Sequence, residues 1–229
     1  MTIVMYDLVG DHDLRFSPHC WRTRMALAHK GLDCDARPTR FTEIASICDG
    51  RQKTLPAIED GARTVSDSWT IAEYLEDAYP DGPSLFGGEA GKRLTGFVHN
   101  WVAGVLHPSL VRLIVLDIFD HLTPEDRDYF RTTREKRFGK TLEEVQAGRD
   151  ERLGGFREQL NGVRLTVKAR PYIGGDEPMY ADYVVFGAFQ WARSISPFKL
   201  LADDDPLAAW FDRCLDLHGG LGRASPGYY

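Results

Sequence analysis

The pattern of hydrophobic and polar positions changes along this chain near residue 80. Before that point, short apolar and β-branched segments typical of strands alternate with patterns of helical period. The strand patterns cover 2–8, 32–37, 55–59 and 63–65, and the helical ones 17–30 and 68–79, with a short helix or turn at 41–48. This order, β-α-β-α-β-β-α, predicts a small α/β domain.

Cap and turn residues support these boundaries. Ser17 followed by Pro18 is a typical helix start, with serine at the N-cap and proline at the first helical position. Gly31 stands where glycine commonly ends a helix. Asp60 and Gly61 lie between two strand patterns and predict a hairpin turn.

After residues 80–83 (Pro-Asp-Gly-Pro), which end a helix, strand patterns almost disappear. An apolar stripe of helical period runs from Leu94 to Val105 and is interrupted near Pro108. Helix-start signals follow at Thr123-Pro124, at Thr141 with Glu144, and at Asp205-Pro206. The sequence therefore predicts an α/β domain over 1–82, a linker over 83–90 and an all-helical domain over 91–229.

Composition narrows the possible functions. The 229 residues carry 28 Lys and Arg against 34 Asp and Glu, and this formal charge of −6 argues against nucleic acid or an anionic membrane surface as a partner. The longest apolar runs are too short to span a bilayer. Four cysteines without Cys-x-x-Cys spacing, and histidines without zinc-ligand spacing, predict reduced thiols in a cytoplasmic protein and no metal site.

The segment Ser17-Pro18-His19-Cys20 carries the most specific chemical signal. A strand, a loop and a helix that opens with a polar residue before proline form the active-site arrangement of thioredoxin-like domains, and here serine replaces the attacking cysteine. A hydroxyl does not exchange disulfides, but it can donate a hydrogen bond to a thiolate supplied by a ligand. The alternative is that Ser17 only caps its helix. Cys20, without a second thiol at position 17, is interpreted as a packing residue.

The energetics favour such a thiolate. A hydrogen bond to a charged group contributes about 1.5–3 kcal/mol, and a helix N-terminus about 0.3–1 kcal/mol. One pKa unit corresponds to about 1.36 kcal/mol, so the pKa of a ligand thiol, usually near 8.5, would fall by roughly 1–3 units. Most of the ligand would then be ionised at neutral pH.

Two further segments fit a peptide-like ligand with charged ends. Leu55 and Pro56 precede a short strand, where thioredoxin-like folds present backbone groups to a ligand; a proline in an edge strand is the alternative. Asp67 and Ser68 begin a helix whose free N–H groups could hold a carboxylate while Asp67 holds an ammonium group. Both residues could instead serve only as helix caps.

Together these segments resemble the glutathione transferases over nearly the whole chain. Residues 67–75 are similar to the family's γ-glutamyl-binding motif and Leu55-Pro56 to its cysteinyl backbone site, while Ser17 stands at the thiol-activating position of the serine-type classes. A narrower resemblance, to bacterial glutathione-dependent β-etherases, covers residues 17–32, 116–129, 142–153 and 204–223.

The resemblance implies a thioredoxin-like α/β domain followed by an all-α domain, and a homodimer. It implies that Ser17 is catalytic and that glutathione, as co-substrate, binds Ser17, Lys53, Thr54, Leu55, Pro56, Asp67 and Ser68. His19 and Trp101 are expected in the wall of a pocket for an aromatic electrophile. Where the family often has Lys, Arg or Gln, this chain has Thr54, with Lys53 one residue earlier as the candidate partner of the glycine carboxylate.

Three functions fit this resemblance. The first is glutathione-dependent cleavage of β-aryl ethers, the second a generalist detoxifying transferase, and the third a non-catalytic ligand-binding protein of the same fold. Only the electrophile pocket separates the first two. The basic run 131–140 is interpreted as a solvated helix face, with a docking site for an acidic substrate tail as the alternative.

Overall fold

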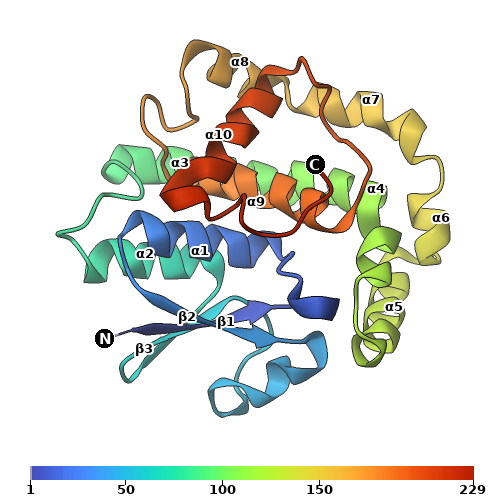
Figure 1. The fold of residues 1–229 in the computed structure, drawn as a ribbon, viewed down its shortest axis with the longest axis horizontal. Helices are drawn as coiled ribbons and strands as arrows, with labels where there is room; N and C mark the ends of the chain where they lie inside the picture. The colour runs from blue at the N-terminus through green and yellow to red at the C-terminus, as the bar shows by residue number, and fades with distance from the viewer. Residues whose placement is uncertain (1) are drawn as a thin grey trace.

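The computed structural model describes residues 2–229, and its first half is built on a four-stranded mixed sheet in the order β2-β1-β3-β4 (Figure 1). β1 (Ile3–Leu8) pairs in parallel with β2 (Cys34–Thr39). It pairs antiparallel with β3 (Ala57–Asp60), which forms a hairpin with β4 (Arg63–Ser66). The predicted hairpin is therefore confirmed.

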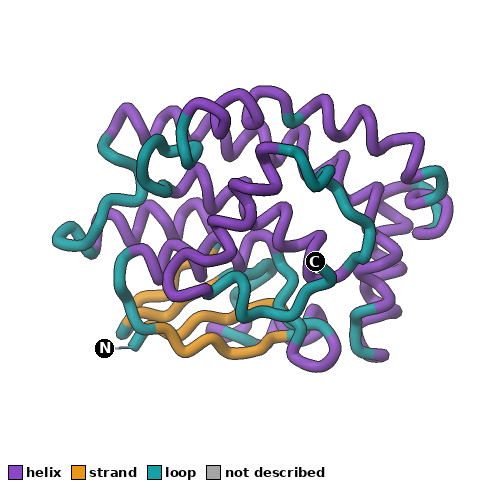
Figure 2. The backbone as a smooth tube through the Cα atoms, turned by 45° about the horizontal axis from the view of Figure 1, so that its top comes forward, coloured by secondary structure: helices purple, strands orange, loops and turns teal. Residues whose placement is uncertain are grey.

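Two helices cover one face of this sheet, as Figures 1 and 2 show. α1 (Pro18–His29) begins at the predicted Ser17 cap, and α2 (Ser68–Ala78) begins at Asp67. Between β2 and β3 lies a short 3-10 helix, η2 (Phe41–Ser46). β2 begins two residues later than the pattern predicts, because the Leu32 N–H donates to the Leu27 carbonyl at 3.0 Å and completes the turn after α1.

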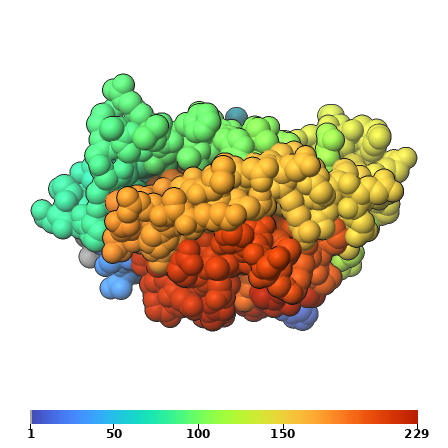
Figure 3. Space-filling model, turned by 90° about the horizontal axis from the view of Figure 1, so that it is seen from above, coloured from blue at the N-terminus to red at the C-terminus, as the bar shows by residue number. Residues whose placement is uncertain are grey.

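The second half is helical, and the fold predicted from the sequence is confirmed. No strand follows β4 in the described chain. Figure 3, seen from above, shows α7 and α8 lying beside α10 on this side of the molecule. The helices are α3 (Glu89–Trp101), α4 (His107–Asp120), α5 (Pro124–Phe138), α6 (Leu142–Gln146), α7 (Arg149–Gln159), α8 (Asn161–Ala169), α9 (Tyr180–Ile195) and α10 (Pro206–Gly220).

The sequence predicts that the apolar helical stripe is interrupted near Pro108. This prediction is wrong, because the helix continues through the proline. Instead a π-helical turn (Val102–Leu106) joins α3 to α4, with the His107 N–H donating to the Val102 carbonyl. Proline lacks an N–H and its ring collides with the carbonyl four residues earlier, here that of Gly104. The additional residue in the π turn shifts that carbonyl, so the helix continues through the proline with a local widening.

The continuous helix Glu89–Asp120 is long and apolar. An 18-residue window has a mean hydropathy of 1.8 and is 39% buried, so by length and composition this helix could cross a membrane, contrary to the expectation from the apolar runs. Core helices of globular proteins have the same properties. Val102, Leu106 and Leu110 of this helix are fully buried in the core.

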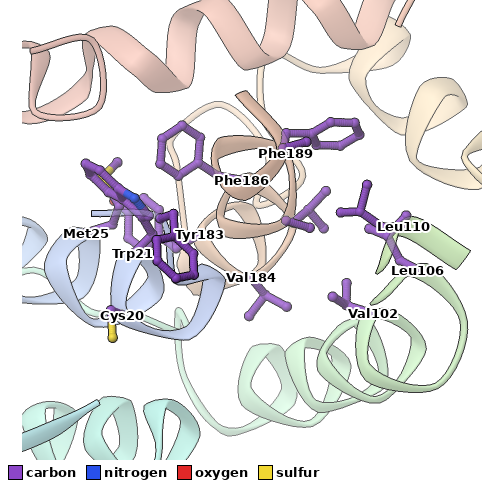
Figure 4. Packing of buried hydrophobic residues seen from close by; sticks show 14 of the residues in the cluster. Cys20, Trp21, Met25, Val102, Leu106, Leu110, Tyr183, Val184, Phe186 and Phe189 are labelled. Atoms are coloured by element: carbon purple, nitrogen blue, oxygen red, sulfur yellow. The ribbon is translucent and has the colours of Figure 1, made fainter. Parts of the chain in front are cut away.

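α9 is the central helix of the core, with α1 on one side and the long helix on the other (Figure 4). Trp21 of α1 meets Phe186 of α9 edge to face, with ring centroids 6.1 Å apart. The two helices approach closely at Gly187, where a Cβ would lie 2.4 Å from the carbonyl oxygen of Pro18. The absence of a side chain at Gly187 therefore sets where the first turn of α1 lies.

A chain of polar side chains also ties the two halves together. His29 Nδ1 and the Tyr183 hydroxyl are 2.7 Å apart, and the same hydroxyl lies 3.0 Å from His218 Nε2. His29 Nε2 lies 3.1 Å from the Ser84 carbonyl, which can only accept, so Nε2 carries the proton and donates it. In a neutral ring Nδ1 is then the acceptor for the Tyr183 hydroxyl. Burial lowers the pKa of both histidines, that of His218 to about 4, so both rings are neutral at pH 7.

Replacing Gly187 by alanine is expected to destabilise the protein. The added methyl group meets backbone atoms of Pro18 that are fixed within α1, so one helix must move. Overpacking of this kind costs roughly 1–3 kcal/mol. Urea unfolding measures the change. Gly155→Ala, on α7 with open space around the glycine, is the control, and it should be neutral or stabilising by up to about 1 kcal/mol. Equal stability of the two variants would contradict the close-approach argument.

Candidate active site

A cavity of about 550 Å³ lies between the two halves of the chain. Seven of the residues singled out in the sequence line it: Ser17, His19, Lys53, Thr54, Leu55, Asp67 and Ser68. A smaller cavity of about 400 Å³ lies among residues of the C-terminal half and contains none of them. The larger cavity is therefore the candidate active site.

Two expected residues do not line this cavity. Pro56 is buried behind Leu55; the peptide bond between them is cis, and the Pro56 carbonyl accepts from the Asp67 N–H at 3.2 Å. Trp101 packs against the core instead, which corrects its expected place in the pocket wall. The residues of the long helix that do face the cavity include Ala103 in the π turn and, at helical spacing, His107 and Val111 of α4. An indole ring in the cavity wall is that of Trp191, on α9.

Ser17 places a hydroxyl at the N-terminus of α1. The residue is 4% exposed, and its Oγ accepts a hydrogen bond from the Cys20 N–H at 3.3 Å. This contact uses a lone pair of the oxygen, so the hydroxyl proton remains free to be donated to a ligand. The positive end of the helix dipole acts at the same point and favours a negative ligand atom.

Cys20 is a packing residue, as the sequence analysis interpreted it. Its side chain is buried, and its Sγ accepts a hydrogen bond from the Leu8 N–H at 3.4 Å. Burial raises the pKa of this thiol well above its usual value, and the nearby Asp7 carboxylate raises it further. A neutral, enclosed thiol is a poor nucleophile.

Asp67 and Ser68 form a second polar corner at the N-terminus of α2. Asp67 has a φ of 76°, and its Oδ1 accepts hydrogen bonds from the Trp69 and Thr70 N–H groups, both at 3.0 Å. Only this one carboxylate oxygen serves the cap. The Ser68 side chain is buried, and its hydroxyl has no hydrogen-bond partner among residues 2–229. A buried, unpaired hydroxyl beside a cavity is suited to a ligand oxygen.

A buried arginine, which the sequence analysis missed, lies behind the start of α1. Arg22 is fully buried, with one guanidinium nitrogen 3.3 Å from His19 Nδ1 and another 3.3 Å from His107 Nε2. Burial lowers the pKa of Arg22 to about 10, that of His107 to about 3, and that of His19 well below its usual value. At neutral pH the cluster holds one positive charge on Arg22, and both imidazoles are neutral acceptors.

α5 of the C-terminal half also contributes to the cavity wall. The buried Asp126 accepts hydrogen bonds from the N–H groups of Phe41 and Thr42, at 3.0 and 2.9 Å, and so fixes η2 against α5. Phe41 then faces Tyr129 across a ring separation of 5.9 Å. Further residues of this wall are Ile44, Phe130, Arg134 and Arg137.

No local sequence pattern marks several of these residues. Arg22 has no carboxylate at helical spacing, and its partner His107 lies 85 positions away. Arg134 and Arg137 belong to the run 131–140, interpreted as a solvated helix face with a docking site for an acidic substrate tail as the alternative, and both line the cavity. Their place in the cavity depends on how α5 packs on η2.

Comparisons with known proteins identify the family. Models of the glutathione S-transferase N-terminal and C-terminal domains match residues 12–84 and 94–217. A glutathione S-transferase-like protein of Aspergillus flavus is 25% identical over 212 residues, covering 78% of this chain and 74% of that protein. These matches cover both halves of the structure.

Solved structures agree. A glutathione S-transferase of Ceriporiopsis subvermispora, crystallised with glutathione, is 26% identical and superimposes with a TM-score of 0.82 over 99% of both chains. A glutathione transferase of Phanerochaete chrysosporium is 28% identical, with a TM-score of 0.76 over 96% of this chain and 94% of that one.

The chain belongs to the glutathione S-transferase family. As a member of this family it is a glutathione transferase, and the predicted co-substrate, glutathione, is confirmed.

Proposed function

We propose that this protein activates the thiol of glutathione through Ser17 and directs the thiolate to an aromatic electrophile held in the 550 Å³ cavity. The observation that carries this proposal is the buried Ser17 hydroxyl at the N-terminus of α1, which borders the cavity and has its proton free to donate. The same cavity holds the polar corner of Asp67 and Ser68. Together they match the two ends of a γ-glutamyl-cysteinyl ligand.

Glutathione is then assigned along the N-terminal half. The hydroxyl of Ser68 and the N–H groups at the start of α2 receive the γ-glutamyl carboxylate, and Asp67 pairs with the ammonium group. Leu55 and Pro56 lie beside the cysteinyl part, and Thr54 and Lys53 beside the glycine end. Ser17 donates to the sulfur, while the α1 dipole and the Arg22 cation favour its negative charge.

We propose a β-aryl ether ketone as the specific electrophile. The sulfur attacks the carbon that bears the aryloxy group, a C–S bond forms, the C–O bond breaks, and the phenolate leaves with the bonding electron pair and takes a proton from water. Phenols have a pKa near 10, so the leaving group needs no strong general acid. Positioning and an ionised sulfur supply the rate. A cavity walled by Phe41, Tyr129 and Trp191 suits two aromatic rings.

The assay for this specificity is release of the phenol from a β-aryl ether ketone by purified protein. We expect release that depends on glutathione and is stoichiometric with thioether formation. Rapid conjugation of an activated aryl halide with no phenol release would favour the generalist transferase instead. Binding of both compounds without any turnover would favour a ligand-binding protein.

Ser17→Ala is expected to raise the pKa of bound glutathione by about 1–2 units, since a hydrogen bond to a charged sulfur contributes about 1.5–3 kcal/mol. kcat/KM at pH 7 should fall about ten-fold or more, and its acid limb should move to higher pH. Thiolate absorbance and a pH–rate profile measure both effects. His107 stays neutral above pH 5, because burial lowers its pKa to about 3, and burial also lowers the pKa of His19 well below its usual value. A limb between pH 5 and 8 therefore reports the thiol.

The control for this variant is Cys20→Ala, which removes the neighbouring thiol and leaves the Ser17 hydroxyl. Its kcat/KM, corrected for the folded fraction, should stay within about two-fold of the native protein. An unchanged thiol pKa in Ser17→Ala would overturn the activation role, and a large loss in Cys20→Ala would point to redox chemistry.

We also propose that two copies form a homodimer through the exposed face of α3. Leu94 and Phe97 are 71% and 72% exposed and lie on adjacent turns of this helix. Large apolar side chains exposed together commonly mark a protein interface. A cytoplasmic, reducing location is proposed as well, because all four cysteines are free thiols.

Light scattering after size exclusion tests the dimer. We expect the native chain to have twice its 25.9 kDa mass and Phe97→Glu to shift toward the monomer. The matched control is Leu165→Glu, which changes a residue of similar exposure, 68%, on α8. A monomeric native protein, or equal dissociation of the two variants, would contradict an interface on α3.

A further inference from the structure

Three cations face the candidate active site without a counter-ion. Lys53, Arg134 and Arg137 line the cavity, and none has a carboxylate within 4.0 Å among residues 2–229. Among the lining residues that the structure describes, Asp67 alone carries a carboxylate. The protein as a whole has six more acidic than basic residues, so this local excess of positive charge runs against the composition of the chain.

Arg131, on the same helix, differs from Arg134 and Arg137 because carboxylates of the protein neutralise its charge. Its guanidinium forms ion pairs with Glu135 at 2.8 Å and Glu143 at 2.9 Å. Arg134 is one turn further along α5 and faces the cavity instead. Arg131 thus has a structural role in ion pairs within the protein, whereas Arg134 has no carboxylate partner among residues 2–229.

Arg134 is held in place by aromatic rings. Its guanidinium carbon lies 4.7 Å from the Phe130 ring centroid and 5.3 Å from that of Phe41, and its Nη1 donates to Thr133 Oγ1 at 2.9 Å. Burial lowers its pKa, and the neighbouring Arg137 lowers it further. A partly buried cation beside a like charge is unfavourable unless an anion joins it, and the guanidinium retains N–H donors for that anion.

We propose that Arg134 and Arg137 form a carboxylate-binding site on the C-terminal wall of the active-site cavity, with Lys53 as the cation from the N-terminal half. The planar fork of a guanidinium matches the two oxygens of a carboxylate. This carboxylate is carried either by the glycine end of glutathione or by the electrophile, which would then be an aromatic acid. The inference rests on the proposed function, because it places these ligands in this cavity.

Equilibrium binding tests the site without requiring turnover. Titration calorimetry is carried out with glutathione, its glycine ethyl ester, S-benzylglutathione and S-(4-carboxybenzyl)glutathione. The variants are Arg134→Gln and Arg137→Gln. Arg137 is exposed and outside any ion pair of the described chain, so its variant should fold even if Arg134→Gln is unstable. Lys136→Gln is the control, since Lys136 is exposed on α5 and does not line the cavity.

Loss of one charge-assisted hydrogen bond should weaken binding about ten-fold or more. A loss for glutathione that the ethyl ester does not show assigns the site to the glycine carboxylate. A loss for the carboxybenzyl compound that the benzyl compound does not show assigns it to an acidic electrophile. Equal losses for all four ligands, or affinities within two-fold of the native protein, would overturn the proposal.

These outcomes are distinguishable from failure of the proposed function. A protein that lacks ether cleavage or thiol activation by Ser17 can still show a carboxylate-specific loss in the arginine variants. Conversely, unchanged binding in those variants would overturn the carboxylate site and would not affect the proposed role of Ser17, which the pH–rate profile tests separately.

Discussion

The packing of α1 against α9 is the contact on which the rest of the site depends. Because Gly187 has no side chain, α9 approaches the Pro18 carbonyl closely enough to fix the first turn of α1. That turn carries Ser17, while Arg22 reaches His107 of α4 from the next turn. The N-terminal half thus supplies Ser17 to the cavity, but the helix that carries it packs on a helix of the C-terminal half.

The distribution of charge follows from the same packing. Arg22 is fully buried, and among residues 2–229 its side-chain hydrogen-bond partners are two neutral imidazoles, so it adds one positive charge behind the start of α1. Elsewhere in the cavity wall, Asp126 fixes η2 on α5, and both Arg134 of α5 and Lys53 of the N-terminal half belong to the lining. A protein with net negative charge therefore has a cavity suited to an anionic ligand.

The parts of the fold that could be predicted are those with local causes. The Ser17 cap, the Asp60-Gly61 hairpin and the capping box at Thr141 each depend on a few neighbouring residues, and each is present. The π turn before Pro108 could not be predicted, because whether a proline breaks a helix depends on the packing around it. Trp101 was misplaced for the same reason: the stripe shows that one face is apolar, but not which partner covers it.

By itself, the sequence determined the order of the elements, the family and seven residues of the N-terminal half that border the cavity, since these lie in short motifs with fixed spacing. Only the tertiary structure decided which residues complete the opposite wall. His107, Trp191, Arg134 and Arg137 come from three helices, α4, α9 and α5, all distant in the chain from Ser17. Their meeting with Ser17 results from burial and close packing across the two halves, and no local pattern encodes such contacts.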